Sequence, residues 1–276
     1  MSKKIEALTK QLEEGVKEFL TSEKYASYLR VMSAFHTYSF SNSLLIAMQK
    51  PEAQLVAGYK TWQSKFNRHV KHGAHAISII APCPITIHKK VDDSENDYEE
   101  VKIIKYRAVN VFDVSDTEGE PLPKICNELT GQVDFLPKIL EKVKEIAPVP
   151  IVFETITNGS NGYYSFSKQK IAIKEGMSDL QTIKTVFHEL AHSLLHSSEE
   201  GKKKDRQTKE VEAESVSYVV ANCLGLDTSD YSFEYIGSWT TGREVKELQD
   251  SMATIQKTAQ MILDKLKGDL VNVELR

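Results

Sequence analysis

Apolar residues near the start of the chain recur at spacings of three and four, which is the pattern of an amphipathic helix. Two such stripes are separated by a polar break at residues 21–22. A third predicted helix follows the polar segment 38–42 and ends at Pro51, because proline cannot continue a helix. The first two stripes are formed by Ile5, Leu8, Leu12, Val16 and Phe19, and then by Tyr25, Leu29, Met32 and Phe35.

Segments rich in isoleucine then indicate β-structure. Residues 77–80 and 85–87 are predicted to be strands hinged at Pro82 and Pro84. Residues 103–113 form another apolar run and are predicted to be a further strand. A small antiparallel sheet is therefore expected to follow the helices.

Acidic and turn-forming residues separate this part of the chain from the rest. Residues 92–100 are predicted to form an acidic loop. Residues 117–123, which contain one glycine and two prolines, are predicted to be the interdomain linker. Two domains follow from this division, residues 1–122 and residues 123–276.

The second half predicts helices around another small sheet, so the expected fold class is α+β. Ser178 and Gln181 form a capping box that marks the start of one helix. The last helix has an apolar stripe that is predicted to dock against the domain, with a short coiled-coil dimer as the alternative. The other expected elements are helix 135–146, strands 150–156, 163–165 and 170–173, a polar loop at 197–207, and helices 208–223 and 243–267.

Composition favours a globular protein inside the cell. The chain has 276 residues, of which 41% are hydrophobic and 27% charged, and its net charge of −4 argues against a general affinity for nucleic acid. Its three cysteines are far apart, which fits a reducing compartment. Neither a signal peptide nor an apolar run of about 18 residues is found, so we expect a cytoplasmic protein without a membrane partner.

One segment departs from the acidic average. Residues 53–91 contain no Asp or Glu, and aromatic residues alternate with basic ones. This combination suits single-stranded nucleic acid, because cations follow the phosphates while aromatic rings stack on bases. The alternative is a solvated basic hairpin with a buried Trp62. The candidate DNA contacts are Tyr59, Lys60, Trp62, Lys65, Arg68 and Lys71.

The strongest chemical signal is the sequence His188-Glu-Leu-Ala-His192. On a helix the two histidines share a face one turn apart, where they can hold one Zn²⁺, and Glu189 lies where it can accept a proton from water. The next predicted helix supplies a third ligand. Glu210 is assigned to the metal and Glu214 to a hydrogen bond with a ligating histidine, with the reverse assignment as the alternative.

Three further side chains are considered near this site. His196 continues the histidine stripe and is expected to support the site without binding the metal, or else to lie partly buried at the helix end. Glu212 points away from the other glutamates and is expected to be solvated. Tyr235 is the candidate donor to a developing oxyanion, with aromatic packing as its alternative role.

These motifs resemble a known family. The run 188–196 followed by the sequence E-V-E-A-E at 210–214 resembles the ImmA/IrrE and ArdC-type zincins of the gluzincin class. In that class the first glutamate of the second motif completes the zinc site, which supports Glu210. In the second half, segments 222–226 and 235–239 are similar to the ArdC branch in particular. A second set of segments resembles the ArdC N-terminal domain, which is associated with single-stranded DNA: 38–46, 49–51, 56–58, Trp62, 70–73 and 111–113.

The resemblance implies a zinc metallopeptidase, with one Zn²⁺ per chain, fused to a single-stranded-DNA-binding domain. Its implied role is antirestriction, or protection of incoming DNA on a mobile element. Two alternatives remain: an ImmA/IrrE-like regulatory protease that cleaves a repressor, and a non-catalytic DNA-binding protein with a structural metal site.

Overall fold

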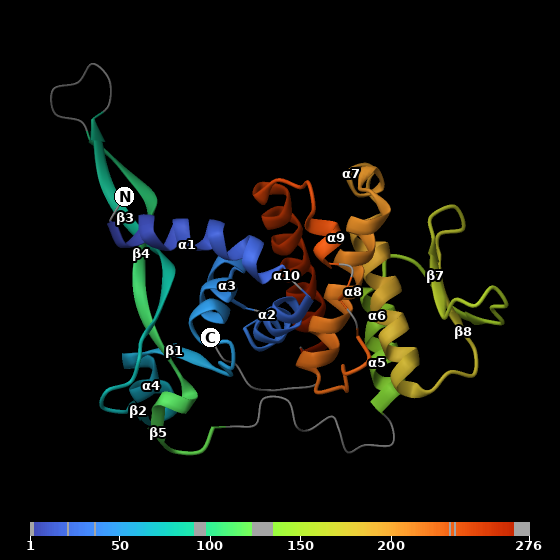
Figure 1. Ribbon diagram of the computed structural model, residues 1–276, viewed down its shortest axis with the longest axis horizontal. Helices are drawn as coiled ribbons and strands as arrows, with labels where there is room; N and C mark the ends of the chain where they lie inside the picture. Colours follow the sequence, from blue (N-terminus) through green and yellow to red (C-terminus); the bar gives the residue numbers. More distant parts are fainter. Residues whose placement is uncertain are drawn as a thin grey trace.

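The computed structural model describes residues 3–20, 22–35, 37–90, 98–122, 135–231, 233–234 and 236–267. The chain begins with α1 (Lys3–Phe19), α2 (Ser22–Ala34) and α3 (Phe40–Gln49), which confirms the predicted N-terminal helices (Figure 1). The described members of the two apolar stripes are buried, namely Ile5, Leu8, Leu12 and Val16, and then Tyr25, Leu29, Met32 and Phe35. Helix α3 begins at its N-cap Ser39, whose side chain accepts the backbone N–H of Asn42.

The N-terminal sheet has the strand order β1-β4-β3 and is antiparallel. It consists of β1 (Val56–Gly58), β4 (Tyr98–Asp113) and β3 (Ile77–Lys90), and the β3–β4 hairpin projects from the body of the molecule (Figure 1). The prediction of two strands hinged at the prolines is wrong, because β3 is continuous. Pro82 and Pro84 are tolerated because β3 lies at the edge of the sheet, where no further strand requires their missing N–H.

Two side-chain amides cover the free edge of β3. Asn42 accepts the N–H of Ile80 at 2.9 Å and donates to its carbonyl oxygen at 2.8 Å. Gln49 forms the same pair of bonds with Ser78, at 2.9 and 3.0 Å. Residues 82 and 84 are the next positions whose backbone groups face this edge, and both are prolines without an N–H. The edge therefore offers few groups that a strand of another molecule could pair with.

The region predicted as a linker is partly structured. Thr117–Gly119 form β5, which pairs antiparallel with β2 (Arg68–Val70), and η1 (Val114–Asp116) is a 3₁₀ turn just before it. Residue 123 of the predicted linker and residues 92–97 of the predicted acidic loop lie outside the described residues, while residues 98–100 of that loop prediction belong to β4. The boundary between residues 122 and 123 stays a prediction.

The second half contains the predicted helix α5 (Phe135–Ile146) and a sheet of order β6-β8-β7. Strand β6 (Ile151–Glu154) runs parallel to β8 (Lys170–Lys174), and β7 (Gly162–Ser165) pairs antiparallel with β8 at the edge of the sheet. The α+β class is therefore confirmed.

Helices α6 (Asp179–Leu195), α8 (Arg206–Cys223) and α10 (Val245–Lys267) follow, as the sequence predicts, with the short α9 (Ile236–Thr240) before α10. The polar loop predicted at 197–207 is wrong in part, because it contains α7 (Glu199–Lys203). Acidic residues in its first turn, basic residues in its last turn and the cap at Ser198 all favour this short helix.

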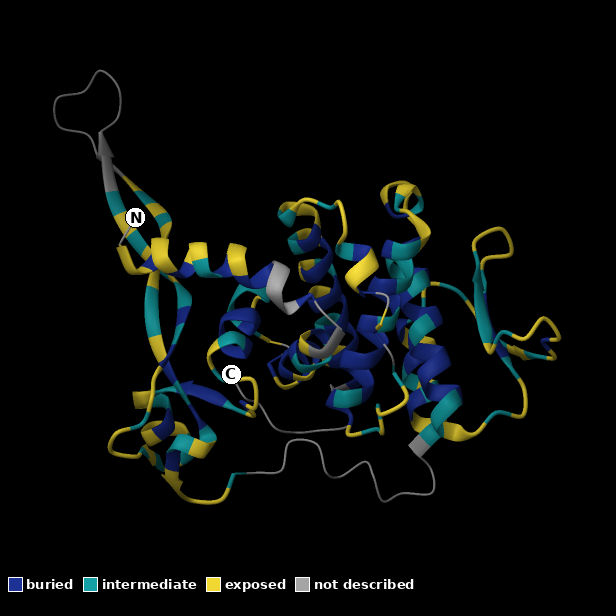
Figure 2. Ribbon diagram, viewed as in Figure 1, coloured by how far each residue is buried: buried dark blue, intermediate teal, exposed yellow. Residues whose placement is uncertain are grey.

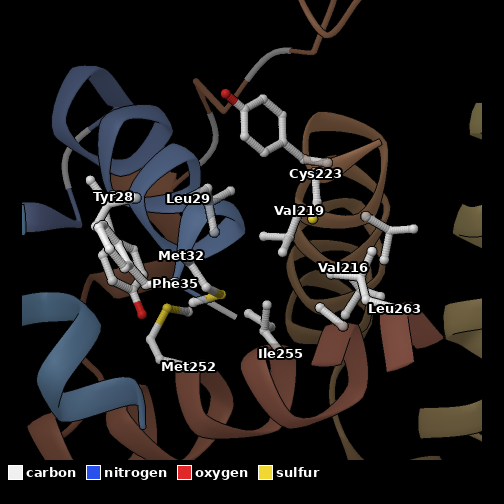
Figure 3. Close-up of a cluster of buried hydrophobic side chains, with 14 of the residues drawn as sticks. Tyr28, Leu29, Met32, Phe35, Val216, Val219, Cys223, Met252, Ile255 and Leu263 are labelled. Atoms are coloured by element: carbon white, nitrogen blue, oxygen red, sulfur yellow. The ribbon is translucent and has the colours of Figure 1, made fainter. Parts of the chain in front are cut away.

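Helix α8 lies at the centre of the core. Figure 3 shows side chains of α2, α8 and α10 converging, among them Leu29, Val219 and Ile255, each 0% exposed. Polar bonds add to this contact: the hydroxyls of Tyr25 and Ser215 are 2.7 Å apart. The buried positions run without interruption from the N-terminal helices to α6 and α8 (Figure 2). Within the described residues, no helix is both long and apolar enough to cross a membrane.

Candidate metal centre

Helix α6 brings two histidines of the motif together. Its N-cap Ser178 accepts the N–H of Gln181 at 3.3 Å, so the predicted helix start is confirmed. The buried face of α6 packs against α8, which leaves the histidine face directed toward a cleft. The Nε2 atoms of His188 and His192 are 3.1 Å apart.

Helix α8 adds a carboxylate to this pair. The Oε2 atom of Glu210 lies 3.5 Å from His188 Nε2 and 3.8 Å from His192 Nε2. Donor atoms about 2.0–2.2 Å from a tetrahedral Zn²⁺ are separated from one another by about 3.3–3.6 Å. The three atoms therefore fit one such ion, and they are the only described group of His, Cys, Asp and Glu donors that meets this proximity.

Glu214 lies one turn further along α8 and contacts the opposite nitrogen of His188. Its Oε2 atom is 2.9 Å from His188 Nδ1, so it can accept the Nδ1–H and leave the Nε2 lone pair facing Glu210. Burial lowers the pKa of His188, but hydrogen bonds to Glu210 and Glu214 outweigh burial and raise it to about 10. The pKa of Glu210 is held below its usual range by the two histidines. The carboxylates of the site thus stabilise positive charge beside them.

A buried chain of polar groups supports His192 from behind. The Nδ1 atoms of His192 and His196 are 2.9 Å apart, and His196 Nε2 lies 3.1 Å from Glu212 Oε2. Lys204 Nζ and Ser251 Oγ bind the other oxygen of Glu212 at 2.6 and 2.7 Å. His196 is therefore buried at the end of α6, in line with the expectation that placed it at the helix end. Its two ring nitrogens face His192 and Glu212.

The expectation that Glu212 is solvated is wrong. Its side chain is 0% exposed because α10 packs over this side of α8. Burial raises the pKa of Glu212, but hydrogen bonds from His196, Lys204 and Ser251 outweigh burial and lower it. The sequence held one signal, since Val211, Ala213 and Val216 give α8 apolar positions on more than one face.

Glu189 points toward the sheet side of the cleft. It is 7% exposed, and burial raises its pKa to about 7, although the charge of His188 and a hydrogen bond from the backbone of Tyr164 act in the opposite direction. A Cβ at Gly162 would lie 2.7 Å from Thr185 Cγ2 and 3.3 Å from Glu189 Cγ. Strand β7 can therefore approach Glu189 this closely only with glycine at position 162.

The cleft has a volume of about 870 Å³. Strand β7 forms one wall, α6 the floor, and α7 and α8 the other wall. A second cavity of about 550 Å³ adjoins it at His188, Glu210 and Glu214. Tyr231 lines the cleft with its hydroxyl 2.8 Å from Ser217 Oγ, whereas Tyr235 lies outside the described residues.

The candidate DNA contacts are divided between surface and core. Tyr59 is 50% exposed, and Lys60, Lys65 and Lys71 are also exposed. Trp62 is 0% exposed and its Nε1–H donates to the carbonyl oxygen of Phe112 at 2.9 Å, so its assignment to base stacking is wrong. It anchors α4 (Tyr59–Phe66) to the sheet.

Arg68 has a structural role in the same region. Its guanidinium donates to Thr117 Oγ1 and to the carbonyl oxygens of Thr117, Gly119 and Glu120. These bonds hold β2 against β5. Its contact with DNA stays a prediction.

Two family models match the chain. Residues 1–112 match the N-terminal domain of anti-restriction factor ArdC, and residues 145–247 match the IrrE N-terminal-like domain of the M78 peptidases. The chain is 26% identical to the Bacillus anthracis protein pXO2-81 in an alignment 299 positions long, which covers 95% of this chain. It spans about half of that relative, 51% of its length.

The fold resembles that of a solved antirestriction protein. The metal-free crystal structure of ArdC from the R388 plasmid aligns with a TM-score of 0.53 and 16% identity, covering 83% of this chain and 85% of that one. Its Mn(II)-bound structure aligns with a TM-score of 0.45 and 17% identity, covering 86% of each chain. The resemblance to ArdC-type proteins is confirmed by the order of the two matched domains together with the shared fold.

Proposed function

We propose that this ArdC-type chain is a zinc-dependent peptidase fused to a module that binds single-stranded DNA, and that it acts in antirestriction. The observation that carries the peptidase part is the convergence of two histidine nitrogens and one carboxylate oxygen beside the buried Glu189, in an open cleft. The N-terminal family match supports the nucleic-acid part.

His188, His192 and Glu210 would hold the metal. A bound divalent ion supplies Lewis acidity, which polarises a peptide carbonyl and makes water more acidic. Glu214 and His196 keep the two histidines in the tautomers that direct Nε2 toward the site. The cleft has room for a short peptide segment between β7 and α8.

Glu189 would move the proton. A carboxylate with a pKa of about 7 can accept a proton from water near neutral pH and return it to the nitrogen of the leaving amine. The backbone N–H of Tyr164 and the absence of a side chain at Gly162 fix the position of this carboxylate. No other described carboxylate of the cleft combines such burial with contact to β7.

The surface of α4 and the loop after it would bind DNA. Lys60, Lys65 and Lys71 are exposed and can neutralise phosphates, while the exposed ring of Tyr59 can stack on a base. Substituting the three lysines with glutamine should weaken binding to a single-stranded oligonucleotide and flatten its salt dependence. Unchanged binding would remove this surface from the proposal.

The peptidase part is tested with Glu189→Gln in the zinc-loaded full chain. The variant should retain zinc and lose cleavage of a peptide library, while the control Glu141→Gln, an exposed acid on α5, should behave like the wild type. Equal cleavage by Glu189→Gln and the wild type would contradict the proposed base. DNA binding that survives removal of the metal, with no peptide cleaved, would instead support a non-catalytic binding protein.

A further inference from the structure

We infer that Arg206 binds an acidic group of the substrate, so that the preferred peptide carries a carboxylate side chain within about two residues of the cleaved bond. This inference rests on the proposed peptidase function and adds a substrate class to it. It follows from the charges that line the cleft, from the position of Arg206 relative to Glu210, and from the helix end at which Arg206 stands.

Four cationic side chains line the cleft. Lys184 and Lys202 each form an ion pair with a nearby carboxylate. Lys209 donates to the carbonyl oxygen of Lys202 at 2.8 Å. Arg206 is exposed, and no partner for its guanidinium is found in the described part of the chain. Its donors are therefore free to bind a ligand.

Arg206 is close to the candidate metal ligands. It precedes Glu210 by four residues on α8, so the two side chains share a face about one turn apart, about 6 Å along the helix axis. Both residues line the cleft and the adjoining cavity, together with His188. An extended peptide advances about 3.3–3.6 Å per residue, so one helical turn corresponds to one or two residues of substrate.

The positive charge of Arg206 does not stabilise α8. Arg206 is the first residue of α8 after its N-cap Asp205, and the first turn of α8 contains no acidic residue. The N-terminus of a helix favours negative charge, so an arginine there opposes the helix dipole. The carboxylate of Asp205 already caps the helix end, so an incoming carboxylate would be attracted by the guanidinium of Arg206, whose fork of N–H donors suits bidentate binding.

The overall charge of the cleft also favours an acidic substrate. Apart from the histidines, which are neutral when they hold a metal, the cleft is lined by four carboxylates, from Glu189, Glu210, Glu214 and Asp230, and they equal in number its four lysine and arginine side chains. A bound divalent ion would leave the cleft with excess positive charge. Such a cleft attracts acidic peptides and repels basic ones.

The test compares peptides that differ only in having Asp, Asn or Lys beside the cleaved bond, using the zinc-loaded full chain. The wild type should cleave the Asp peptide with a kcat/KM about tenfold above that of the Asn peptide. Arg206→Gln should remove this preference, and Arg206→Glu should transfer it to the Lys peptide. Lys203→Gln, an exposed cation that does not line the cleft, should keep the wild-type preference.

A binding measurement separates this inference from the proposed function. A labelled acidic peptide should bind Glu189→Gln protein about tenfold more tightly than it binds the Glu189→Gln/Arg206→Gln double variant. Cleavage by the wild type without acidic preference would overturn the role of Arg206 and leave the peptidase proposal intact. Absence of any cleavage or peptide binding would overturn both. Loss of oligonucleotide binding in Arg206→Gln, with peptide preference unchanged, would also overturn it and indicate a phosphate contact.

Discussion

Replacing Glu212 with glutamine is expected to weaken metal binding, although Glu212 does not touch the metal site. A ligating His192 keeps Nε2 unprotonated and carries its proton on Nδ1, which lies 2.9 Å from Nδ1 of His196. His196 must therefore accept at Nδ1 and donate from Nε2, which lies 3.1 Å from the carboxylate of Glu212. A neutral amide is a weaker acceptor than a carboxylate, so the substitution loosens this orientation.

The substitution has two separate effects, a loss of folding free energy and a loss of metal affinity, and the structure indicates the size of each. Glu212 is fully buried, but the side chain of its partner Lys204 is 31% exposed, so the ion pair is partly screened. The loss of folding free energy should thus fall below the roughly 3–5 kcal/mol of a fully buried pair, at about 1–3 kcal/mol. Metal affinity should fall by about 10–100-fold, which is typical of groups that orient a ligating histidine.

Urea unfolding measures the first effect, and zinc titration against a chromophoric chelator measures the second. Ser251→Ala is the matched control, because it removes the 2.7 Å hydrogen bond to the same carboxylate and leaves His196 in contact. The control should lose about 1 kcal/mol of folding free energy and keep its zinc affinity. Wild-type zinc affinity in folded Glu212→Gln protein would refute the orienting role.

Three further changes test other parts of the account. Gly162→Ala should place a methyl group against Thr185 and displace Glu189, so peptide cleavage should fall while zinc affinity, measured by the same titration, stays near wild type. Trp62→Phe should destabilise the fold by about 1–3 kcal/mol in urea, because the carbonyl of residue 112 loses its donor, but DNA affinity of the folded protein should persist; lost affinity would restore Trp62 as a contact. Burial raises the pKa of Asp113, but hydrogen bonds from the side chain and N–H of Ser115 and from the N–H groups of residues 54 and 55 outweigh burial and lower it from the usual aspartate value of 3.8. Its stabilisation is therefore complete above that pH and is lost as the pH falls through the lower folded-state pKa, so Asp113→Asn should show a smaller acid-induced loss of stability by circular dichroism; an unchanged acid profile would contradict this.

The sequence predicted the elements whose signals are local. Helical spacing located α1, α2 and α10, and the capping pair at Ser178 and Gln181 located the start of α6. The spacing of the two histidines requires only one turn of helix, so their shared face could be predicted as well. The position of Glu210 beside them depends on how α8 packs on α6, so the spacing alone left the reverse assignment to Glu214 open, and the family resemblance supported Glu210.

The features that could not be predicted arise from contacts between distant segments. Periodicity along α8 separates Glu212 from Glu210 but cannot show that α10 covers the other side. The prolines of β3 suggest a hinge unless the strand is known to be at the sheet edge. Trp62 lies among basic residues in the sequence, yet its ring is buried against β4, because α4 packs back on the sheet.

The central claim is that His188, His192 and Glu210 form the metal site, and zinc titration of Glu210→Gln and Glu214→Gln tests it most directly. The two glutamates lie on the same face of α8 one turn apart, so each variant is the control for the other. The wild type should bind one zinc ion per chain. Glu210→Gln should weaken binding by more than about a hundredfold, and Glu214→Gln by no more than about 10–100-fold, as expected for a group that orients a ligand. Wild-type affinity in Glu210→Gln, or the larger loss in Glu214→Gln, would contradict the account.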